Sequence, residues 1–436
     1  MLRFKSINRR ATGASCGRAL IRGLSWLLAA SVCASPLAAL AKSHAHGHRQ
    51  PAKAAKTARA SAPVAAQASE KPDPEVLLVE VYKELGANHL QQALAKADKL
   101  VEDYPNFRLG HLIRGDLLMM QTHKVTSFGN ASGPEDKLRN LREEAIVRLK
   151  SLRERPDPNL LPRLVLQLRE DQKHVLLVDA KRSRLYVYAN EGGRLKFVND
   201  YYISQGKLGV NKLKEGDQKT PIGIYYITSH LSGDRLPDFY GSGALPINYP
   251  NEWDKVNGRS GSGIWLHGTP PDSYSRPPLS SDGCVVLTNP DLHKLATSVE
   301  IGKTPVVIAE SVDFVSKAKW DSDRHLATRL IDNWRRDLES MNPKRMMENY
   351  SRQFKSDRGE DLNTWLAKHQ QFMSGVRGVS IALKDETFFF YPGRDNMIVS
   401  TFTQESKVGK SRTTIRKRQY WAKEGSLWKI VYELNL

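Results

Sequence analysis

A series of short apolar segments, separated by glycines and polar turns, constrains the fold of this chain more than any other feature. Short runs of this kind are typical of β-strands that pair mostly with antiparallel neighbours. Between the last two runs, Asn289-Pro290-Asp291 through Val299 fits a short capped helix. Residues 173–311 are therefore predicted to form a β-rich sandwich or barrel. The runs are Val175–Val178, Leu185–Tyr188, Leu195–Ile203, Ile222–Thr228, Ile264–Leu266, Val285–Leu287 and Val306–Ala309.

Two of these segments carry a histidine and a cysteine in positions suited to nucleophilic catalysis. Ile264–Leu266 ends at His267, and a tight turn at Gly283 delivers Cys284 into the next apolar segment, 17 residues after the histidine. A thiol needs a base to become a thiolate at neutral pH, and imidazole titrates in the right range. The spacing allows the intervening loop to return and place the two side chains together. The alternative is a buried, inert cysteine that packs as a small apolar residue.

The residues around this pair resemble the L,D-transpeptidase catalytic domain, which remodels bacterial peptidoglycan. An apolar strand leads into His267-Gly268-Thr269, and a proline-rich loop leads to Ser281-Asp282-Gly283-Cys284. Upstream, Asp217 to Tyr225 is similar to the G-D-x-x-T-P-x-G-x-Y segment of that family. The resemblance covers Lys173 to Ser311.

The resemblance implies the chemistry of the site. Cys284 would attack the carbonyl of a diamino acid in a peptidoglycan stem peptide, and terminal D-alanine would leave. His267 would act as general base and then as acid. The main-chain carbonyl of Gly268 would orient the histidine. The backbone N–H of Cys284, with that of Gly283, would hold the oxyanion. No metal or other cofactor is expected.

The sequence departs from the cross-linking members of this family at two positions. Those members have histidine before the Gly-Cys pair and arginine two positions after the cysteine, where this chain has Asp282 and Val286. Asp282 would either steer a cationic amine or cap a turn. Arg259 would either replace the lost positive charge or serve as an exposed structural residue. Ser281 and Trp265, which flank the pair in sequence, are predicted to contact substrate together with Asp282 and Arg259.

This variant pattern looks more like the L,D-carboxypeptidases that set cell shape, which use water as the acyl acceptor. Trimming of tetrapeptide stems to tripeptides is therefore the favoured activity. Cross-linking by transpeptidation and release of lipoproteins from the wall are alternatives of the same chemistry. An envelope scaffold that binds partner proteins is the alternative of another class.

The N-terminus has the pattern of a secretory signal. Six basic residues and no acidic one precede the apolar run Leu24–Leu40, which small residues close at Ala41. We expect residues 1–41 to be a signal peptide, and the exported protein to reach the periplasm without a stable membrane span. An uncleaved anchor is the alternative, although the run is short and contains Pro36.

Cleavage would also change the cysteine content and the charge. Cys16 and Cys33 would leave with the signal, so that Cys284 would be the single thiol. The formal charge of +19 would fall by the six signal charges to +13. A basic exported surface favours anionic envelope polymers rather than nucleic acid. Residues 42–73, rich in Ala, Lys, Pro and Ser, are predicted to be a disordered linker.

The two remaining regions make the chain a multidomain α+β protein. Residues 74–172 are predicted to form a helical, tetratricopeptide-like module that ends in a short helix at Leu164–Leu168. Residues 320–436 are predicted to begin with two helices, the second including Tyr350 and Phe354, and to continue as a curved sheet. That order resembles the nuclear-transport-factor-2-like, or SnoaL-like, cone. Both regions would serve in binding envelope partners.

Overall fold

The computed structural model describes residues 71–122, 129, 135–373 and 378–436. The predicted signal peptide and nearly all of the predicted linker lie outside these ranges. The described residues form a single compact unit from the first helix to the C-terminus. Within those ranges, no helix is both long enough and apolar enough to cross a membrane.

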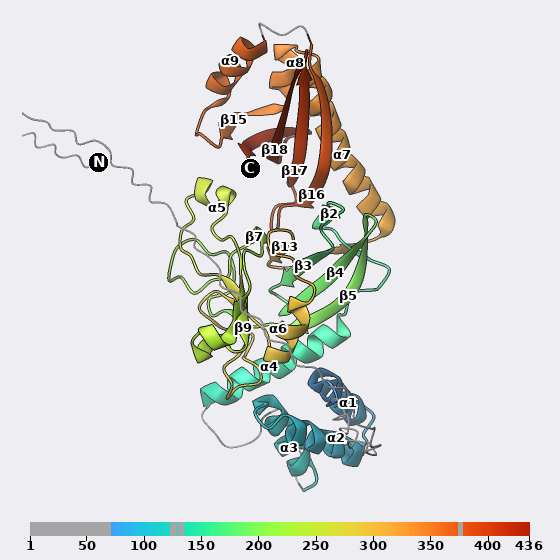
Figure 1. The fold of residues 1–436 in the computed structure, drawn as a ribbon. Coiled ribbons are helices and arrows are strands. Elements are labelled where there is room, and N and C mark those ends of the chain that lie inside the picture. The colour runs from blue at the N-terminus through green and yellow to red at the C-terminus, as the bar shows by residue number, and fades with distance from the viewer. Residues whose placement is uncertain (1–70, 123–128, 130–134, 374–377) are drawn as a thin grey trace, which may run out of the picture. The chain divides into compact units, whose positions relative to one another are not determined.

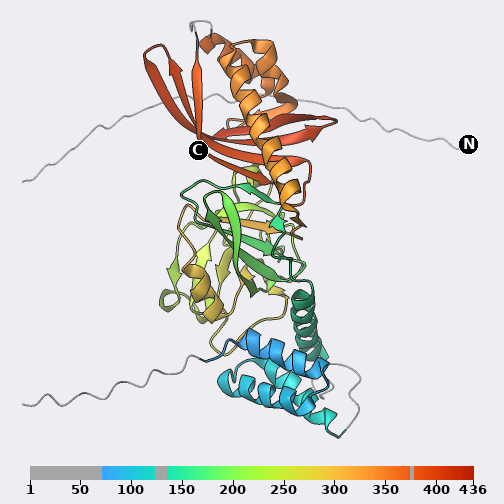
Figure 2. The same cartoon turned by 90° about the vertical axis from the view of Figure 1, so that its right-hand side faces the viewer.

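Helices α1 to α4 precede the sheets in the part of the chain that the structure describes (Figures 1 and 2). They are α1 (Pro74–Gly86), α2 (Leu90–Asp103), α3 (Arg108–Met120) and α4 (Glu135–Arg153). The side chain of Asp73 caps the first, where Pro74 supplies a preset φ angle. Apolar residues at helical spacing meet in a common core, which also includes Tyr274 from the loop between His267 and Cys284.

The central region contains a five-stranded sheet and a four-stranded sheet. The five-stranded sheet has the order β5-β4-β3-β13-β7, and the four-stranded sheet has the order β12-β10-β9-β8. Most neighbours are antiparallel, as expected, but β3 pairs with β13 and β10 with β12 in parallel. The bounds are β3 His174–Asp179, β4 Arg184–Glu191, β5 Arg194–Tyr202, β7 Gly223–Tyr226, β8 Leu231–Ser232, β9 Gly243–Pro246, β10 Trp265–His267, β12 Val285–Val286 and β13 Pro305–Ala309.

Short elements connect these strands. A two-stranded sheet pairs β6 (Gln205–Gly206) with β11 (Leu279–Ser281) in parallel. Two 3-10 helices, η1 (Gly233–Arg235) and η2 (Asp238–Tyr240), lie before β9, and α5 (Glu252–Val256) follows it. The predicted capped helix is α6 (Asn289–Ala296), and its cap is Thr288 rather than Asn289.

Both faces of the five-stranded sheet are covered, which explains why its strands are apolar at consecutive positions. Leu176 and Val178 pack in the cluster that contains the four-stranded sheet. Val175 and Leu177 point the other way, into a cluster shared with the C-terminal sheet. Full burial of each such side chain contributes about 1.5–3 kcal/mol relative to exposure.

Within residues 317–373 and 378–436, the C-terminal region consists of three helices and one mixed sheet, which strand β2 joins. The helices are α7 (Lys317–Glu339), α8 (Pro343–Glu348) and α9 (Leu362–Met373). The sheet has the order β15-β19-β18-β17-β16-β2, and α7 packs along β16 and β2 (Figure 1). Its strands are β15 Tyr350–Ser356, β16 Ser380–Phe390, β17 Met397–Val408, β18 Ser411–Glu424, β19 Leu427–Asn435 and β2 Val165–Gln167.

Two helix predictions are wrong. The helical region ends at Arg153. Leu164–Leu168 contains strand β2 instead of a helix, because consecutive residues are buried on opposite faces. Val165 packs in the cluster shared with the five-stranded sheet, and Leu166 packs in the cluster that includes α7. A second short strand, β1 (Leu161–Pro162), pairs with β14 (Phe314–Val315). Tyr350 and Phe354 belong to strand β15, not to a second helix. Short apolar runs do not reveal their period, so the partner decides the conformation.

Candidate active site

The parallel pairing of β10 with β12 places the predicted histidine and cysteine on one face. Leu266 pairs with Val285, so Cys284 lies level with Trp265, one position before the paired strand. Because side chains alternate along a strand, Trp265 and His267 share a face, and Cys284 faces the same way. The structure therefore brings the two residues together from segments that the loop 268–283 separates.

His267 is fully buried and is held by a main-chain oxygen. Its Nδ1 lies 2.7 Å from the carbonyl oxygen of Gly268. A carbonyl can only accept, so Nδ1 carries the proton and Nε2 of the neutral ring has a free lone pair. Burial lowers the pKa of His267 to about 4, against the opposing hydrogen bond to Gly268. Nε2 is buried and has no hydrogen-bond partner among the described residues, so it is available to accept a proton.

Gly268 can serve this role only as glycine. A Cβ on Gly268 would collide with Oδ1 of Asn289. That Asn289 amide accepts a hydrogen bond from the Ser242 N–H and donates one to the carbonyl of Thr269, each at 2.9 Å. Asn289 thus fixes the turn that presents the Gly268 carbonyl to His267, a role that the sequence reading missed.

Cys284 is half-buried, and its thiol is protonated at rest. Its Sγ donates to the carbonyl oxygen of Gly263 at 3.4 Å. Burial raises the pKa of the thiol, and the Asp282 charge adds to that effect, whereas a hydrogen bond from the Trp265 backbone and the charge of Arg276 oppose it. The resting pair is therefore a neutral thiol beside a neutral imidazole. Attack on a substrate must then be coupled to proton transfer to His267.

The turn before Cys284 is fixed by hydrogen bonds. The Ser281 hydroxyl donates to the carbonyl of Cys284 at 2.6 Å and accepts from the N–H of Gly283 at 3.1 Å. The Gly283 N–H, which the sequence predicted to help hold an oxyanion, is engaged by the Ser281 hydroxyl in this structure. The Cys284 N–H has no partner within the described ranges and stays available. Gly283 has φ +130°, and a Cβ there would lie 2.8 Å from the Lys219 carbonyl oxygen.

The Asp217 to Tyr225 segment stabilises the turn at Gly283 through hydrogen bonds. The hydroxyl of Thr220 donates to the carbonyl of Gly283 at 2.9 Å and accepts from the N–H of Gly206 at 3.0 Å. Asp217 accepts from Lys212 Nζ at 2.8 Å and from the Leu213 N–H at 2.7 Å. The motif therefore stabilises the loop and the turn rather than taking part in bond making.

Asp282 and Arg259 both contact residues from other segments of the chain. Asp282 is exposed and accepts from Lys207 Nζ at 2.9 Å, so its charge is compensated. Arg259 donates to the carbonyl of Ile222 at 3.2 Å and lies 3.4 Å from a carboxylate oxygen of Asp254. The Arg259 guanidinium thus joins its own loop to the segments that carry Ile222 and Asn211.

Aromatic side chains from η2 cover the histidine. The Tyr240 ring lies 4.7 Å from that of Trp265 and 5.1 Å from that of His267, between ring centroids. The Phe239 ring lies 5.7 Å from His267. Trp265 therefore contributes to the wall of the site. Nothing in the sequence between Leu231 and Gly241 signalled this contact, because it depends on the fold of β8 and β9.

Arg276 is the cation of the site that the sequence reading missed. Its guanidinium carbon lies 4.4 Å from the centre of the Phe239 ring. Its charge acts on both His267 and Cys284. The signal that could have found it is its position in the proline-rich loop between the two motif residues. Within the described ranges, no cluster of His, Cys, Asp or Glu side chains could hold a metal ion.

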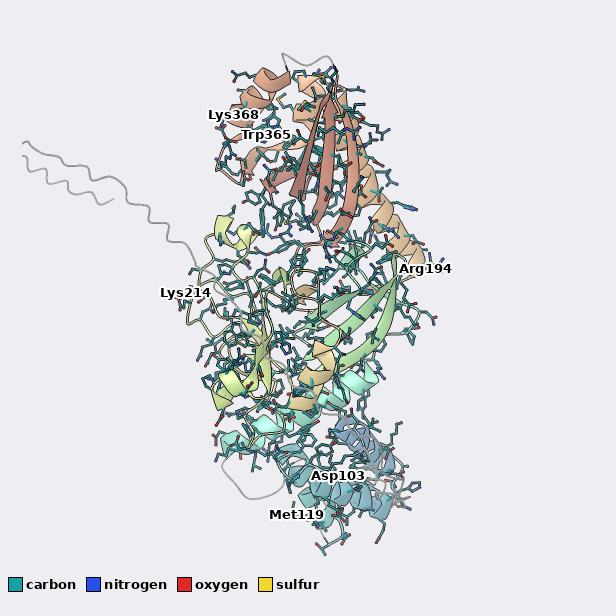
Figure 3. All side chains as sticks on the ribbon, viewed as in Figure 1. Asp103, Met119, Arg194, Lys214, Trp365 and Lys368 are labelled. Carbon is teal, nitrogen blue, oxygen red and sulfur yellow. The ribbon has the colours of Figure 1, made fainter. Side chains whose placement is uncertain are left out.

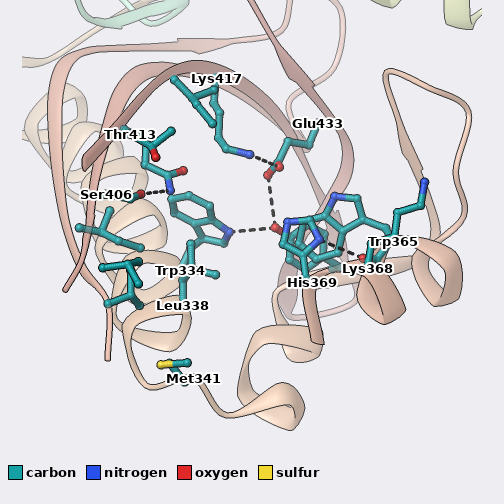
Figure 4. A pocket seen from close by; sticks show the side chains of 16 residues that line it. Trp334, Leu338, Met341, Trp365, Lys368, His369, Ser406, Thr413, Lys417 and Glu433 are labelled. Atoms are coloured by element: carbon teal, nitrogen blue, oxygen red, sulfur yellow. Dashed lines mark hydrogen bonds and ion pairs between the residues drawn. The ribbon is translucent and has the colours of Figure 1, made fainter. Parts of the chain in front are cut away.

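A separate cavity of about 360 Å³ lies in the C-terminal region between α7, α9 and the sheet (Figure 4). Its walls are largely apolar, with Trp334 and Trp365 among them. At its polar end the Tyr350 hydroxyl accepts from Trp334 Nε1 at 3.0 Å and donates to Glu433 at 3.2 Å. Lys417 pairs with the same carboxylate at 2.7 Å. Among the described residues that line this cavity, no nucleophile–base pair is present.

Two family models match the chain. The model described as the L,D-transpeptidase catalytic domain matches residues 173–308. The model described as the Cds6 C-terminal NTF2-like domain matches residues 326–434. No curated protein matches the sequence.

Solved structures match across both regions. The structure of Bd1075 from Bdellovibrio bacteriovorus is 30% identical, and the match covers 63% of this chain and 98% of that one with a TM-score of 0.56. This chain belongs to the L,D-transpeptidase family. The helical cell shape determining protein Pgp2 from Campylobacter jejuni is 26% identical over 65% of this chain and 97% of its own, with a TM-score of 0.54. The present L,D-transpeptidase-family enzyme also carries a C-terminal NTF2-like domain.

Proposed function

We propose that this L,D-transpeptidase-family protein is a periplasmic L,D-carboxypeptidase that trims tetrapeptide stems of peptidoglycan to tripeptides. Cys284 is the nucleophile and His267 is the general base. The observation that carries the proposal is the orientation of His267: Nδ1 is held by Gly268, and Nε2 is free on the face of β10 that Cys284 shares.

In the proposed reaction the thiol proton moves to Nε2 of His267 as Sγ attacks the carbonyl carbon of the diamino acid. The Cys284 N–H stabilises the oxyanion. The C–N bond to D-alanine then breaks, and the imidazolium protonates the leaving amine. Water attacks the thioester and gives its proton to His267, and the thiolate leaves and is reprotonated. The products are tripeptide and D-alanine.

Hydrolysis is favoured over cross-linking by the residues beyond the cysteine. Val286 occupies the position at which cross-linking members carry arginine, and its side chain is 2% exposed. No guanidinium is therefore present there to grip a second stem peptide. The similarity to Pgp2, described as a helical cell shape determining protein, favours the same assignment. Cross-linking and the release of lipoproteins are the candidates that follow, since they share the acyl-enzyme.

The other regions have binding roles in this proposal. Residues 1–41 direct export, and residues 42–73 link the signal to the folded unit. The helices of the tetratricopeptide-like region and the cavity of the NTF2-like domain bind partners or polymer in the envelope. The basic composition is consistent with an anionic partner.

The test is incubation of the purified exported protein with tetrapeptide muropeptides, followed by chromatography and mass spectrometry. Tripeptide and free D-alanine without dimers are the expected products, and Cys284→Ala should form neither. Dimers would make the protein a transpeptidase. An unchanged mixture from folded protein would favour an envelope scaffold, the alternative of another class.

A further inference from the structure

Arg276 presents an unpaired cation beside the nucleophile. Among the residues that the structure describes, its guanidinium makes no ion pair and no hydrogen bond, and the side chain is only half-buried. The guanidinium carbon lies over the Phe239 ring, 4.4 Å from its centre. A cation held by a ring face uses none of its N–H donors on a hydrogen-bond acceptor, so they stay free to donate. Phe239 in turn contacts His267, so those donors lie next to the Cys284–His267 pair.

The loop that carries Arg276 is held in place by the N-terminal helices. The Tyr274 ring packs on that of Phe107 at 4.7 Å, and its N–H donates to the Asn106 carbonyl at 3.2 Å. The Ser275 hydroxyl donates to the buried carboxylate of Glu144 at 2.7 Å. These contacts flank Arg276 directly in sequence and order its backbone.

On the other side of Arg276, the loop is tied to the central sheet. The Tyr202 hydroxyl donates to the carbonyl oxygen of Arg276 at 2.8 Å. The Tyr202 ring is itself covered by Arg148, whose guanidinium carbon lies 3.7 Å from the ring centre. Arg148 also pairs with Glu144 at 2.9 Å, so the helices and the sheet fix the same loop. An arginine with an ordered backbone and free donors is pre-organised to bind an anion.

The chemistry of the proposed substrate supplies that anion. A carboxypeptidase cuts the last peptide bond, so the carboxylate of the leaving residue lies one residue, roughly 3.5 Å of extended chain, beyond the attacked carbonyl. A guanidinium binds a carboxylate with two parallel hydrogen bonds. We propose, on the basis of the proposed function, that Arg276 binds the terminal carboxylate of the stem peptide and so selects the last bond for cleavage. The N-terminal helices position Arg276 for this task.

The test compares a soluble stem tetrapeptide that has a free C-terminal carboxylate with the same peptide as its C-terminal amide. Binding of both is measured by calorimetry to protein carrying Cys284→Ala, which cannot turn over. The free acid should bind roughly 10- to 100-fold more tightly than the amide, the range expected of a charge-assisted hydrogen bond. Adding Arg276→Ala should abolish this preference and leave amide binding unchanged, whereas Arg276→Lys should retain part of it.

The exposed Arg194 at the start of β5 provides the control for net charge, because Arg194→Ala should leave the preference intact (Figure 3). Equal affinity for acid and amide with Arg276 present would overturn the proposal, as would a preference that survives Arg276→Ala. Tripeptide formation by the wild type is scored separately. A carboxylate preference that depends on Arg276 without tripeptide formation would refute the reaction and support the binding role.

Discussion

The hydroxyl of Thr220 provides the sharpest test of how the threonine-proline motif supports the active site. Thr220 is fully buried, and its Oγ1 bridges the Gly206 N–H and the Gly283 carbonyl at 3.0 and 2.9 Å. Thr220→Val keeps the shape of the side chain and removes both hydrogen bonds. Thr220→Ser keeps the hydroxyl and removes only a methyl group.

The loss in the valine variant can be worked out from these contacts. A buried donor and a buried acceptor would each be left unsatisfied at about 1–3 kcal/mol, so the free energy of unfolding should fall by roughly 2–6 kcal/mol. Gly283 immediately precedes Cys284, so the nucleophile would also lose its positioning. A displacement of about 1 Å can cost on the order of 100-fold in rate.

The assay is denaturant unfolding together with kcat/KM on tetrapeptide and the rate of thiol alkylation. The valine variant should lose stability and at least roughly 10-fold in kcat/KM, whereas the serine variant should stay close to the wild type in turnover. If the valine variant is as stable and as active as the serine variant, Thr220 does not support the turn and the account of the motif is wrong.

Contacts elsewhere make three further predictions. Burial lowers the pKa of His267 to about 4, so kcat/KM should show no acid-side loss between about pH 5.5 and 7; a midpoint in that interval would contradict a neutral base. Burial raises the pKa of the Asp217 carboxyl, but a hydrogen bond from Lys212 and three hydrogen bonds from backbone N–H groups outweigh burial and lower this pKa. A carboxyl group whose pKa is lower in the folded than in the unfolded state stabilises the fold fully at pH values above its unfolded pKa of about 4. This stabilisation decreases as the pH falls below that value. Asp217→Asn should therefore destabilise the protein at about pH 7, and progressively less as the pH falls from the unfolded value toward the lowered folded pKa; a loss that stays constant over this acid range would refute this. The Trp253 ring stacks on that of Tyr420, with 4.5 Å between ring centroids. Trp253→Ala should therefore lower the free energy of unfolding by about 3–5 kcal/mol. An unchanged denaturant midpoint would mean that the central sheets and the C-terminal sheet fold separately.

Local patterns predicted most strands of the central sheets and placed His267 and Cys284 at the ends of neighbouring apolar segments. Gly283 marked the turn, and the apolar runs before His267 and after Cys284 marked strands β10 and β12. These features are encoded over a few residues by backbone conformation and by side-chain alternation. The long strands of the C-terminal sheet were predicted for the same reason.

Contacts between distant segments could not be read from such patterns. Strand β2 pairs with β16, where Val165 is level with Phe389, although the whole central region separates them in sequence. The sequence predicted a separate cone over residues 320–436, but Trp253 and the C-terminal sheet share one apolar cluster. Removal of residues 320–436 would expose that cluster and destabilise the central sheet.

Hydrogen-bond use was equally hidden from the sequence. The Gly283 N–H was expected to face an oxyanion, but the Ser281 hydroxyl already occupies it. Arg259 looked available but is engaged with Asp254, whereas Arg276 makes no ion pair with any residue that the structure describes. Donors and acceptors are assigned only when the turn geometry is fixed, which depends on residues far along the chain.

The central claim, that water completes the reaction begun by Cys284, is tested most directly in water enriched in the heavy oxygen isotope. Purified protein is incubated with tetrapeptide muropeptide, and the masses of the released tripeptide and D-alanine are measured. The account predicts a tripeptide whose new carboxylate carries one heavy oxygen and D-alanine that carries none. D-alanine release with unlabelled cross-linked dimers, or no D-alanine release from folded protein, would contradict it.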